Sequence, residues 1–121
     1  MIKRVKVVGV CVGDQERARD FYVERLGFRL VADEPMGPDA RWLEVAPPEG
    51  ETHLALWTPP GFEGRIGTFT HVVFYSDDVR ATAAELQGRG VEFKQEPEEQ
   101  AGGVMGQFLD PDGNIFVLAG D

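Results

Sequence analysis

Residues 14–27 read Asp14-Gln15-Glu16-Arg17-Ala18-Arg19-Asp20-Phe21-Tyr22-Val23-Glu24-Arg25-Leu26-Gly27, which is the pattern of an amphipathic helix. Asp14 is a favourable N-cap residue, and Gly27 lies where a glycine commonly follows the last turn of a helix. Between them, apolar side chains recur at three- and four-residue spacing, as on a helix with one buried face. These side chains are Ala18, Phe21, Tyr22 and Leu26. The sequence therefore predicts one helix over this stretch.

The same pattern returns further along the chain. Asp77-Asp78 precedes a second apolar stripe that ends at Gly90, so both the cap and the terminal glycine are offset by 63 residues (77 − 14 and 90 − 27). The turn sequence Pro47-Pro48-Glu49-Gly50 falls at the same offset on Asp110-Pro111-Asp112-Gly113 (110 − 47). Three agreements at one offset indicate a tandem repeat.

Extended segments surround both predicted helices. Runs that are rich in β-branched or aromatic residues and bounded by Gly or Pro are typical of strands. Such runs cover residues 5–12, 28–31, 41–45, 52–57, 69–75, 91–93, 104–109 and 115–118. The order is βαβββ twice, so the predicted fold is α+β, with one module over about 1–60 and another over about 67–121 of a single domain. We interpret Glu96-Pro97-Glu98-Glu99-Gln100 as a solvated loop, because Pro and clustered carboxylates disfavour a packed element.

A helix on one face of each small sheet leaves the other face to line a cavity, so we expect a cupped mixed sheet around a binding space. Side chains alternate between the two faces along a strand. The helix-facing set is Val8, Val10, Val12, Leu54, Leu56, Val72, Phe74, Phe116 and Leu118. The cavity-facing set is Val7, Gly9, Cys11, His53, Ala55, Trp57, His71, Val73, Tyr75, Ile115 and Val117.

Composition argues against several classes of function. The chain of 121 residues has 12 Lys and Arg against 21 Asp and Glu, a formal net charge of −9. Such a surface repels a phosphate backbone, so nucleic-acid binding is not expected. No apolar run is long enough to cross a membrane, and the single cysteine, Cys11, allows no internal disulfide. We therefore expect a cytoplasmic protein.

Four segments carry a resemblance to a known family. They are Val8-Gly9-Val10-Cys11-Val12-Gly13-Asp14; Phe21-Tyr22 with Leu26-Gly27-Phe28; His71-Val72-Val73-Phe74 with Asp77-Asp78-Val79 and Arg89-Gly90-Val91; and Phe108-Leu109-Asp110-Pro111-Asp112-Gly113-Asn114. Together they resemble the vicinal oxygen chelate superfamily, which includes glyoxalase I, bleomycin-resistance proteins, fosfomycin-resistance transferases and extradiol ring-cleaving dioxygenases. The resemblance covers nearly the whole chain and implies two βαβββ modules.

The resemblance also bears on metal binding. In the metal-using members, four cavity positions carry His, Gln or Glu, and these correspond here to Val7, His53, His71 and Val117. Valine cannot ligate a metal, so a four-ligand site is incomplete. Glu44 is the nearest candidate for a third ligand beside the two histidines. One hypothesis is therefore a lyase, isomerase or ring-cleaving dioxygenase that holds Fe, Zn, Ni or Mn on His53, His71 and Glu44.

Aromatic side chains dominate the remaining predicted cavity. The candidate ligand-binding residues are Cys11, Trp42, Trp57, Phe62 and Tyr75. Aromatic walls with a few polar groups suit a flat organic molecule held by stacking and one or two hydrogen bonds. Our first hypothesis is a bleomycin-resistance-like protein that binds a small aromatic molecule, and the acidic surface would favour a cationic one.

Two further expectations complete the sequence analysis. His71 or His53 could serve as the catalytic residue of metal-free acid–base chemistry, which is a third hypothesis for function. The family resemblance implies a homodimer, and an uncovered sheet face and open sheet edges also favour a second copy of the chain.

Overall fold

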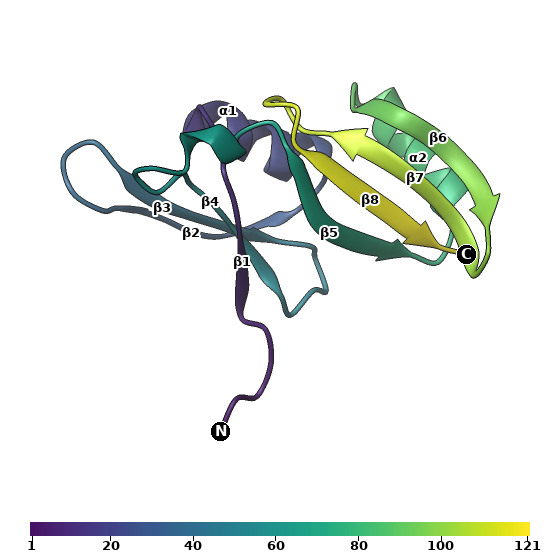
Figure 1. Cartoon of the computed structure of the whole chain (residues 1–121), viewed down its shortest axis with the longest axis horizontal. Coiled ribbons are helices and arrows are strands. Elements are labelled where there is room, and N and C mark those ends of the chain that lie inside the picture. The colour runs from purple at the N-terminus through teal and green to yellow at the C-terminus, as the bar shows by residue number, and fades with distance from the viewer. The chain divides into compact units, whose positions relative to one another are not determined.

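The computed structural model describes residues 1–121, and the chain divides into two compact units, Met1–Ile66 and Gly67–Asp121. Each unit has the predicted βαβββ order (Figure 1). The first contains β1 (Val7–Val10), α1 (Gln15–Asp20), a π-helical turn η1 (Phe21–Arg25), β2 (Arg29–Pro35), β3 (Arg41–Ala46), β4 (His53–Leu56) and a short 3-10 turn η2 (Glu63–Arg65). The second contains β5 (Phe69–Ser76), α2 (Val79–Gly88), β6 (Glu92–Gln100), β7 (Gly103–Leu109) and β8 (Ile115–Gly120).

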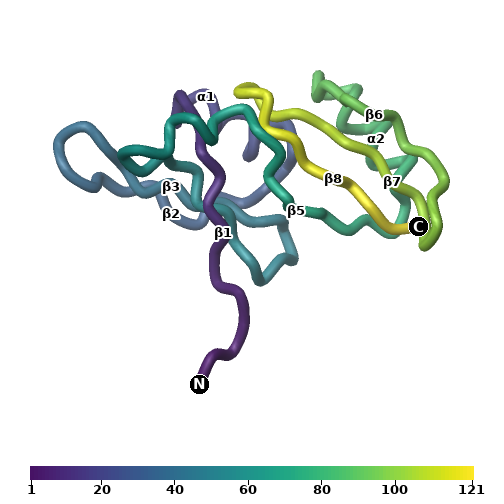
Figure 2. Tube along the Cα trace, in the orientation of Figure 1, coloured from purple at the N-terminus to yellow at the C-terminus, as the bar shows by residue number.

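The two sheets have the same topology. Their strand orders are β1-β4-β3-β2 and β5-β8-β7-β6. The first strand of each module runs parallel to the last, and all other pairs are antiparallel. Figure 2 follows this path from purple to teal through the first sheet and from teal to yellow through the second. The predicted α+β fold of two βαβββ modules is thus confirmed.

The turn that links the last two strands has the same hydrogen bond in both modules. Gly50 N donates to Pro47 O at 3.0 Å, and Gly113 N donates to Asp110 O at 3.0 Å. The two turns therefore share a hydrogen bond between residues three apart, as the sequence offset of Pro47-Pro48-Glu49-Gly50 and Asp110-Pro111-Asp112-Gly113 predicts.

The first helix differs from its prediction at one end. The Asp14 carboxylate accepts from Arg17 N at 3.0 Å, and Gly27 has a φ of 76°, so the predicted N-cap and terminal glycine are correct. After Asp20, however, the helix widens into a π-helical turn, closed by Leu26 N donating to Phe21 O. The sequence period could not show this turn, because a single extra residue per turn shifts the apolar pattern very little over five residues.

The second helix ends where the sequence indicates, but its N-cap is the second residue of the Asp77-Asp78 pair, 64 (78 − 14) and not 63 residues after Asp14. Asp78 is the N-cap, and its carboxylate accepts from Ala81 N at 3.0 Å. Gly90 has a φ of 89°, which a glycine adopts without steric cost. None of the helices combines the length and the apolar character needed to span a bilayer.

Each unit has its own core between its helix and its sheet. The alternation predicted from the sequence is clear along β5, where Val73 and Tyr75 are exposed and Phe74 is half-buried, whereas Leu54, Ala55 and Leu56 on β4 are all buried. The first core contains Val10, Val12, Ala18, Phe21, Tyr22, Leu43, Val45, Leu54 and Leu56. The second contains Val79, Ala83, Leu86, Val91, Phe108, Phe116 and Leu118.

The structure corrects the prediction for residues 96–100. The segment from Glu96 to Gln100 is not a loop but the second half of β6, paired with β7. It is an edge strand, where exposed carboxylates and a proline without an N–H are tolerated because one side of the strand has no partner. The register is irregular between Gln95 and Glu98, which accommodates Pro97.

Candidate functional site

The face of the first sheet opposite its helix carries the most distinctive side chains of this unit. Glu44 on β3 pairs with Ala55 on β4, and Ala55 pairs on its other side with Gly9 on β1. Because side chains two apart share a face, Trp42 joins Glu44, and both His53 and Trp57 join Ala55. We call this set, Gly9, Trp42, Glu44, His53, Ala55 and Trp57, the open face.

A carboxylate on the open face holds two neighbouring side chains. Trp42 Nε1 donates to Glu44 Oε1 at 2.9 Å, and His53 Nδ1 contacts Glu44 Oε2. Burial alone would raise the pKa of Glu44, but its hydrogen bonds with His53 and Trp42 and its electrostatic interactions with His53 and Lys6 outweigh burial. The pKa of Glu44 therefore lies below its ordinary value of 4.5, and the group is a carboxylate at neutral pH.

Two tryptophans lie next to this polar cluster. The ring centroids of Trp42 and Trp57 are 5.6 Å apart, and the ring planes are inclined by 59°. Both residues are only half-buried. Their exposed ring surface is suited to a flat aromatic molecule.

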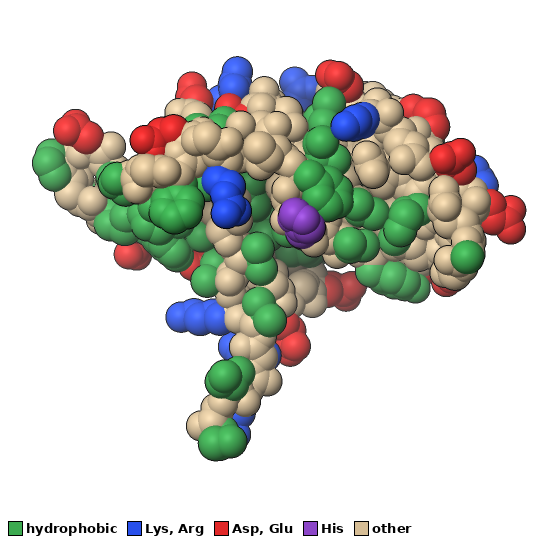
Figure 3. Space-filling model, in the orientation of Figure 1, with side chains coloured by type: hydrophobic (Ala, Val, Ile, Leu, Met, Phe, Trp, Pro, Cys, Tyr) green, Lys and Arg blue, Asp and Glu red, His purple; other side chains and the backbone are tan.

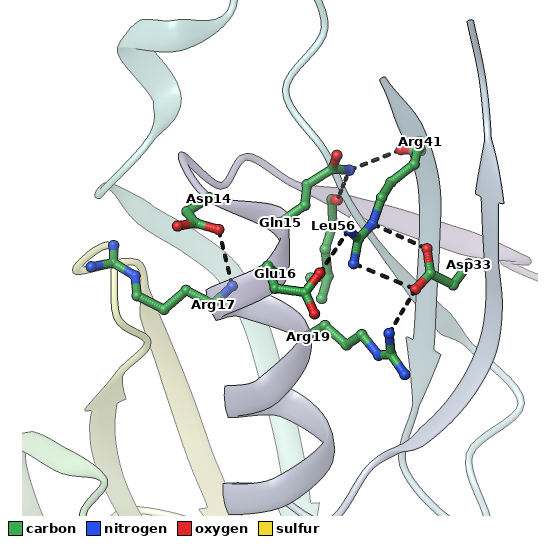
Figure 4. A network of polar contacts seen from close by, with 8 residues as sticks. All are labelled: Asp14, Gln15, Glu16, Arg17, Arg19, Asp33, Arg41 and Leu56. Carbon is green, nitrogen blue, oxygen red and sulfur yellow. Dashed lines mark hydrogen bonds and ion pairs between the residues drawn. The ribbon is translucent and has the colours of Figure 1, made fainter. Parts of the chain in front are cut away.

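Gln15 fixes the two strands that carry these tryptophans. Its Nε2 donates to Arg41 O and to Leu56 O, each at 2.8 Å (Figure 4). Those carbonyl groups directly precede Trp42 and Trp57. The β3–β4 pairing covers Glu44 with Ala55 and Val45 with Leu54, so Gln15 joins the strands beyond the end of that ladder. The first residue of α1 thus sets the separation of the tryptophan pair.

Ion pairs hold the same helix against β2 and β3 (Figure 4). Arg41 Nε lies 3.0 Å from Asp33 Oδ1, and Arg41 Nη1 lies 2.9 Å from Glu16 Oε2. Arg19 Nη1 lies 3.1 Å from Asp33 Oδ2. Because both arginines face carboxylates, this network has no spare positive charge for an anion, and we assign it a structural role.

Surface pockets reach both ends of the open face. A pocket of about 450 Å³ reaches His53 and is lined also by Arg4, Arg29 and the β3–β4 loop. Another, of about 240 Å³, reaches Trp57 and is lined also by Gln15 and Arg41. The volume of the first pocket is in the range of small-molecule sites, and that of the second is below this range.

The second unit places its candidate residues on strand β5. His71 lies at an irregularity in the β5–β8 register, is exposed, and has a φ of 64°, which is uncommon for a residue with a side chain. Its ring meets the edge of Phe69, with centroids 4.8 Å apart. Tyr75 is exposed on the same strand, whereas Val117 on β8 is buried.

The strand registers show which residues of the two modules correspond. Gly9 pairs with Ala55 in the first module, and Val73 pairs with Val117 in the second. Gly9 and Val73 each lie five residues before the N-cap of the following helix, which is Asp14 in the first module and Asp78 in the second. Ala55 is therefore the counterpart of Val117, and His53 lies two residues before that position. A shift of this size is invisible in the sequence, because both residues face the same side of the strand.

Few of the predicted side chains are available together as metal ligands. His53 and Glu44 contact each other in the first unit, and His71 belongs to the second unit. Val7 and Val117 provide no donor atoms. No group of three or more His, Cys, Asp or Glu side chains in the structure is placed to hold a metal ion.

Two of the candidate ligand-binding residues predicted from the sequence lie outside the strands. Cys11 is half-buried just after β1, and Phe62 is exposed in the loop before η2. Sequence reasoning missed Gln15, whose only signal is its position directly after the N-cap Asp14, and it gave Gly9 no role beyond facing the cavity.

Comparison with known proteins establishes the family. The profile of the Glyoxalase/Bleomycin resistance protein/Dioxygenase superfamily matches residues 4–118. The chain belongs to this superfamily. The resemblance drawn from the sequence motifs is thereby confirmed.

Members of the glyoxalase/bleomycin-resistance superfamily similar to this chain include proteins of known sequence and structure. The uncharacterized protein YetH of Bacillus subtilis (strain 168) is 42% identical over 118 residues, which are 98% of each chain. A superfamily member from Sphaerobacter thermophilus DSM 20745 has a crystal structure with a TM-score of 0.90 and 37% identity, covering 99% of this chain and 98% of that one. TnmS3, an antibiotic binding protein from Streptomyces sp. CB03234, has a TM-score of 0.84 and 42% identity, covering 98% of this chain and 96% of that one.

Proposed function

We propose that this chain binds a small, flat aromatic molecule on the open face of its first sheet. The observation that carries the proposal is the half-exposed pair of Trp42 and Trp57 beside the Glu44–His53 contact. Stacking on the tryptophans supplies affinity, and the polar pair supplies a directional contact.

Two findings support binding as the activity. The antibiotic binding protein TnmS3 shares 42% of its residues with this chain over nearly its full length. The metal donor set here is sparse, whereas aromatic recognition needs no metal. The net charge of −9 favours a neutral or cationic ligand over an anionic one.

Calorimetric titration with 2-methoxyfluorene, a flat neutral tricycle, tests the proposal. We expect saturable binding that Trp57→Leu weakens about tenfold, because an aromatic contact contributes about 0.5–1.5 kcal/mol beyond the area it buries. Phe93→Leu, on β6 of the second unit, is the control and should bind like wild type. Absence of binding to the wild-type protein, or equal binding by Trp57→Leu, would contradict the proposal.

We further propose that the protein is a homodimer in which the second sheet contacts a second copy. Phe69, Val73, Tyr75 and Met105 expose between 39% and 74% of their surface in this unit, and Figure 3 shows hydrophobic side chains over β5 and β8. An apolar sheet face of this kind is typical of an interface.

Light scattering checks this assembly. We expect about twice the chain mass of 13.4 kDa for wild type, and a mass near that of one chain for Val73→Asp. Ala84→Asp, on the exposed side of α2, is the matched control and should stay dimeric. A monomeric wild type, or a dimeric Val73→Asp, would refute the assignment of this face.

The other hypotheses drawn from the sequence remain proposals. Metal-dependent chemistry on His53, His71 and Glu44 stays a prediction. Acid–base catalysis without a metal is favoured by one observation, the contact between His53 and Glu44, since a carboxylate that orients an imidazole is common to such sites. A cytoplasmic location is consistent with the lone cysteine, Cys11.

A further inference from the structure

An open position lies between the two ends of the open face. Gly9 and Ala55 are paired neighbours on β1 and β4. A Cβ atom built on Gly9 would meet no atom within 4 Å, so the space above this position is open. Ala55 is only 2% exposed and is already covered. Gly9 therefore provides a flat, low floor over which a planar molecule can lie.

This floor lies between an aromatic end and a polar end. Trp57 is two residues after Ala55, and His53 is two residues before it. Since a strand rises about 3.3 Å per residue, their Cα atoms are roughly 13 Å apart. That span is close to the length of a fused three-ring system with one substituent.

The polar end presents a hydrogen-bond acceptor. Trp42 Nε1 can only donate a hydrogen bond, and Glu44 Oε1 accepts it. The other carboxylate oxygen, Oε2, faces His53 Nδ1. The proton of a neutral His53 ring therefore lies on Nδ1, and Nε2 carries a lone pair. His53 Nε2 is not buried without a partner. The His53 side chain is 21% exposed beside the pocket of about 450 Å³, so a ligand can reach it.

We infer that the ligand is a flat fused-ring phenol, whose rings lie over Gly9 against the tryptophan pair and whose hydroxyl group donates to His53 Nε2. This inference rests on the proposed binding function and narrows it to a chemical class. A neutral hydroxyl group satisfies Nε2, and an ether at the same position cannot do so, because it has no proton to donate.

A matched pair of compounds tests the hydroxyl contact. We expect wild type to bind 2-hydroxyfluorene about tenfold more tightly than 2-methoxyfluorene at pH 7.5, as one well-placed hydrogen bond predicts. In His53→Phe, which keeps an aromatic ring but no acceptor, the ratio of the two Kd values should fall to about one. Equal Kd values in wild type, or an unchanged ratio in His53→Phe, would overturn the inference and leave the proposed function standing. Absence of binding by both compounds would overturn both.

A substitution on the floor tests the position of the rings. Gly9→Leu places a side chain into open space on a strand, so we expect the melting temperature to stay within about 4 °C and both fluorenes to bind at least tenfold more weakly. Gly64→Leu, at another glycine with open space, is the matched control and should bind like wild type. Wild-type affinity in a folded Gly9→Leu protein would overturn the proposed ring position. Should Gly9→Leu fail to fold, Gly9→Ser gives the same test with a smaller side chain, and an unchanged Kd would overturn it.

Discussion

Replacing Asn114 by alanine is expected to lower the free energy of unfolding by about 3 kcal/mol, because buried Asp110 and two part-buried backbone N–H groups lose a hydrogen-bond partner together. Asn114 is 1% exposed at the end of the Asp-Pro-Asp-Gly turn. Its Oδ1 accepts from Gly67 N at 2.8 Å and from Thr68 N at 3.3 Å, and its Nδ2 donates to Asp110 Oδ2 at 2.8 Å. The side chain thus ties the turn before β8 to the segment that leads into β5.

Urea unfolding followed by far-ultraviolet circular dichroism measures this effect. Gln100→Ala is the control, since it removes an exposed amide at the end of β6 and should change stability by less than about 0.5 kcal/mol. Both tryptophans lie in residues 1–66, so tryptophan emission reports on that unit alone, and a transition that moves only in circular dichroism would assign the loss to residues 67–121. A loss below about 1 kcal/mol would show that the two backbone donors find other partners.

Local interactions, including those of this turn, are the reason that the fold could be predicted from the sequence. Asp14 and Asp78 cap their helices with local hydrogen bonds, and the turns at Gly50 and Gly113 close within four residues. Such interactions depend on neighbouring residues alone, so they appear in the sequence as spacing. The segment from Glu96 to Gln100 was mispredicted because its strand character depends on pairing with β7, a contact between distant residues.

The site was only partly readable for a related reason. Alternation placed Trp57 and His53 on one face, because the period of a strand is local. Gln15 was missed, since the two carbonyls that it joins lie 26 and 41 residues away. The correspondence of Val117 with Ala55 needed the pairing register, which long-range contacts determine.

Glu44→Gln is expected to lower the free energy of unfolding at pH 7 by about 2 kcal/mol, because hydrogen bonds to a buried charged group contribute about 1.5–3 kcal/mol. The wild-type carboxylate, 8% exposed, accepts from Trp42 Nε1 and contacts His53 Nδ1. The variant keeps the size of the side chain but loses the charge. Within the open face, this is the substitution with the largest expected effect on stability.

The pH dependence of that difference follows from the direction of the Glu44 pKa shift. The folded protein holds this pKa below the ordinary value of 4.5, so the folded state binds fewer protons near that pH than the unfolded chain does. The stabilisation by the carboxylate is therefore complete above pH 4.5 and is lost as the pH falls through the lower pKa of the folded state. Urea unfolding of wild type and Glu44→Gln between pH 3 and pH 7, followed by tryptophan emission, should show the two stabilities converging at the acidic end. His53 and Lys6 are the basic side chains that face this carboxylate, and Lys6→Gln should reduce the difference only slightly. A stability difference that stays constant over this range would show that the contribution of Glu44 comes from packing and not from its charge.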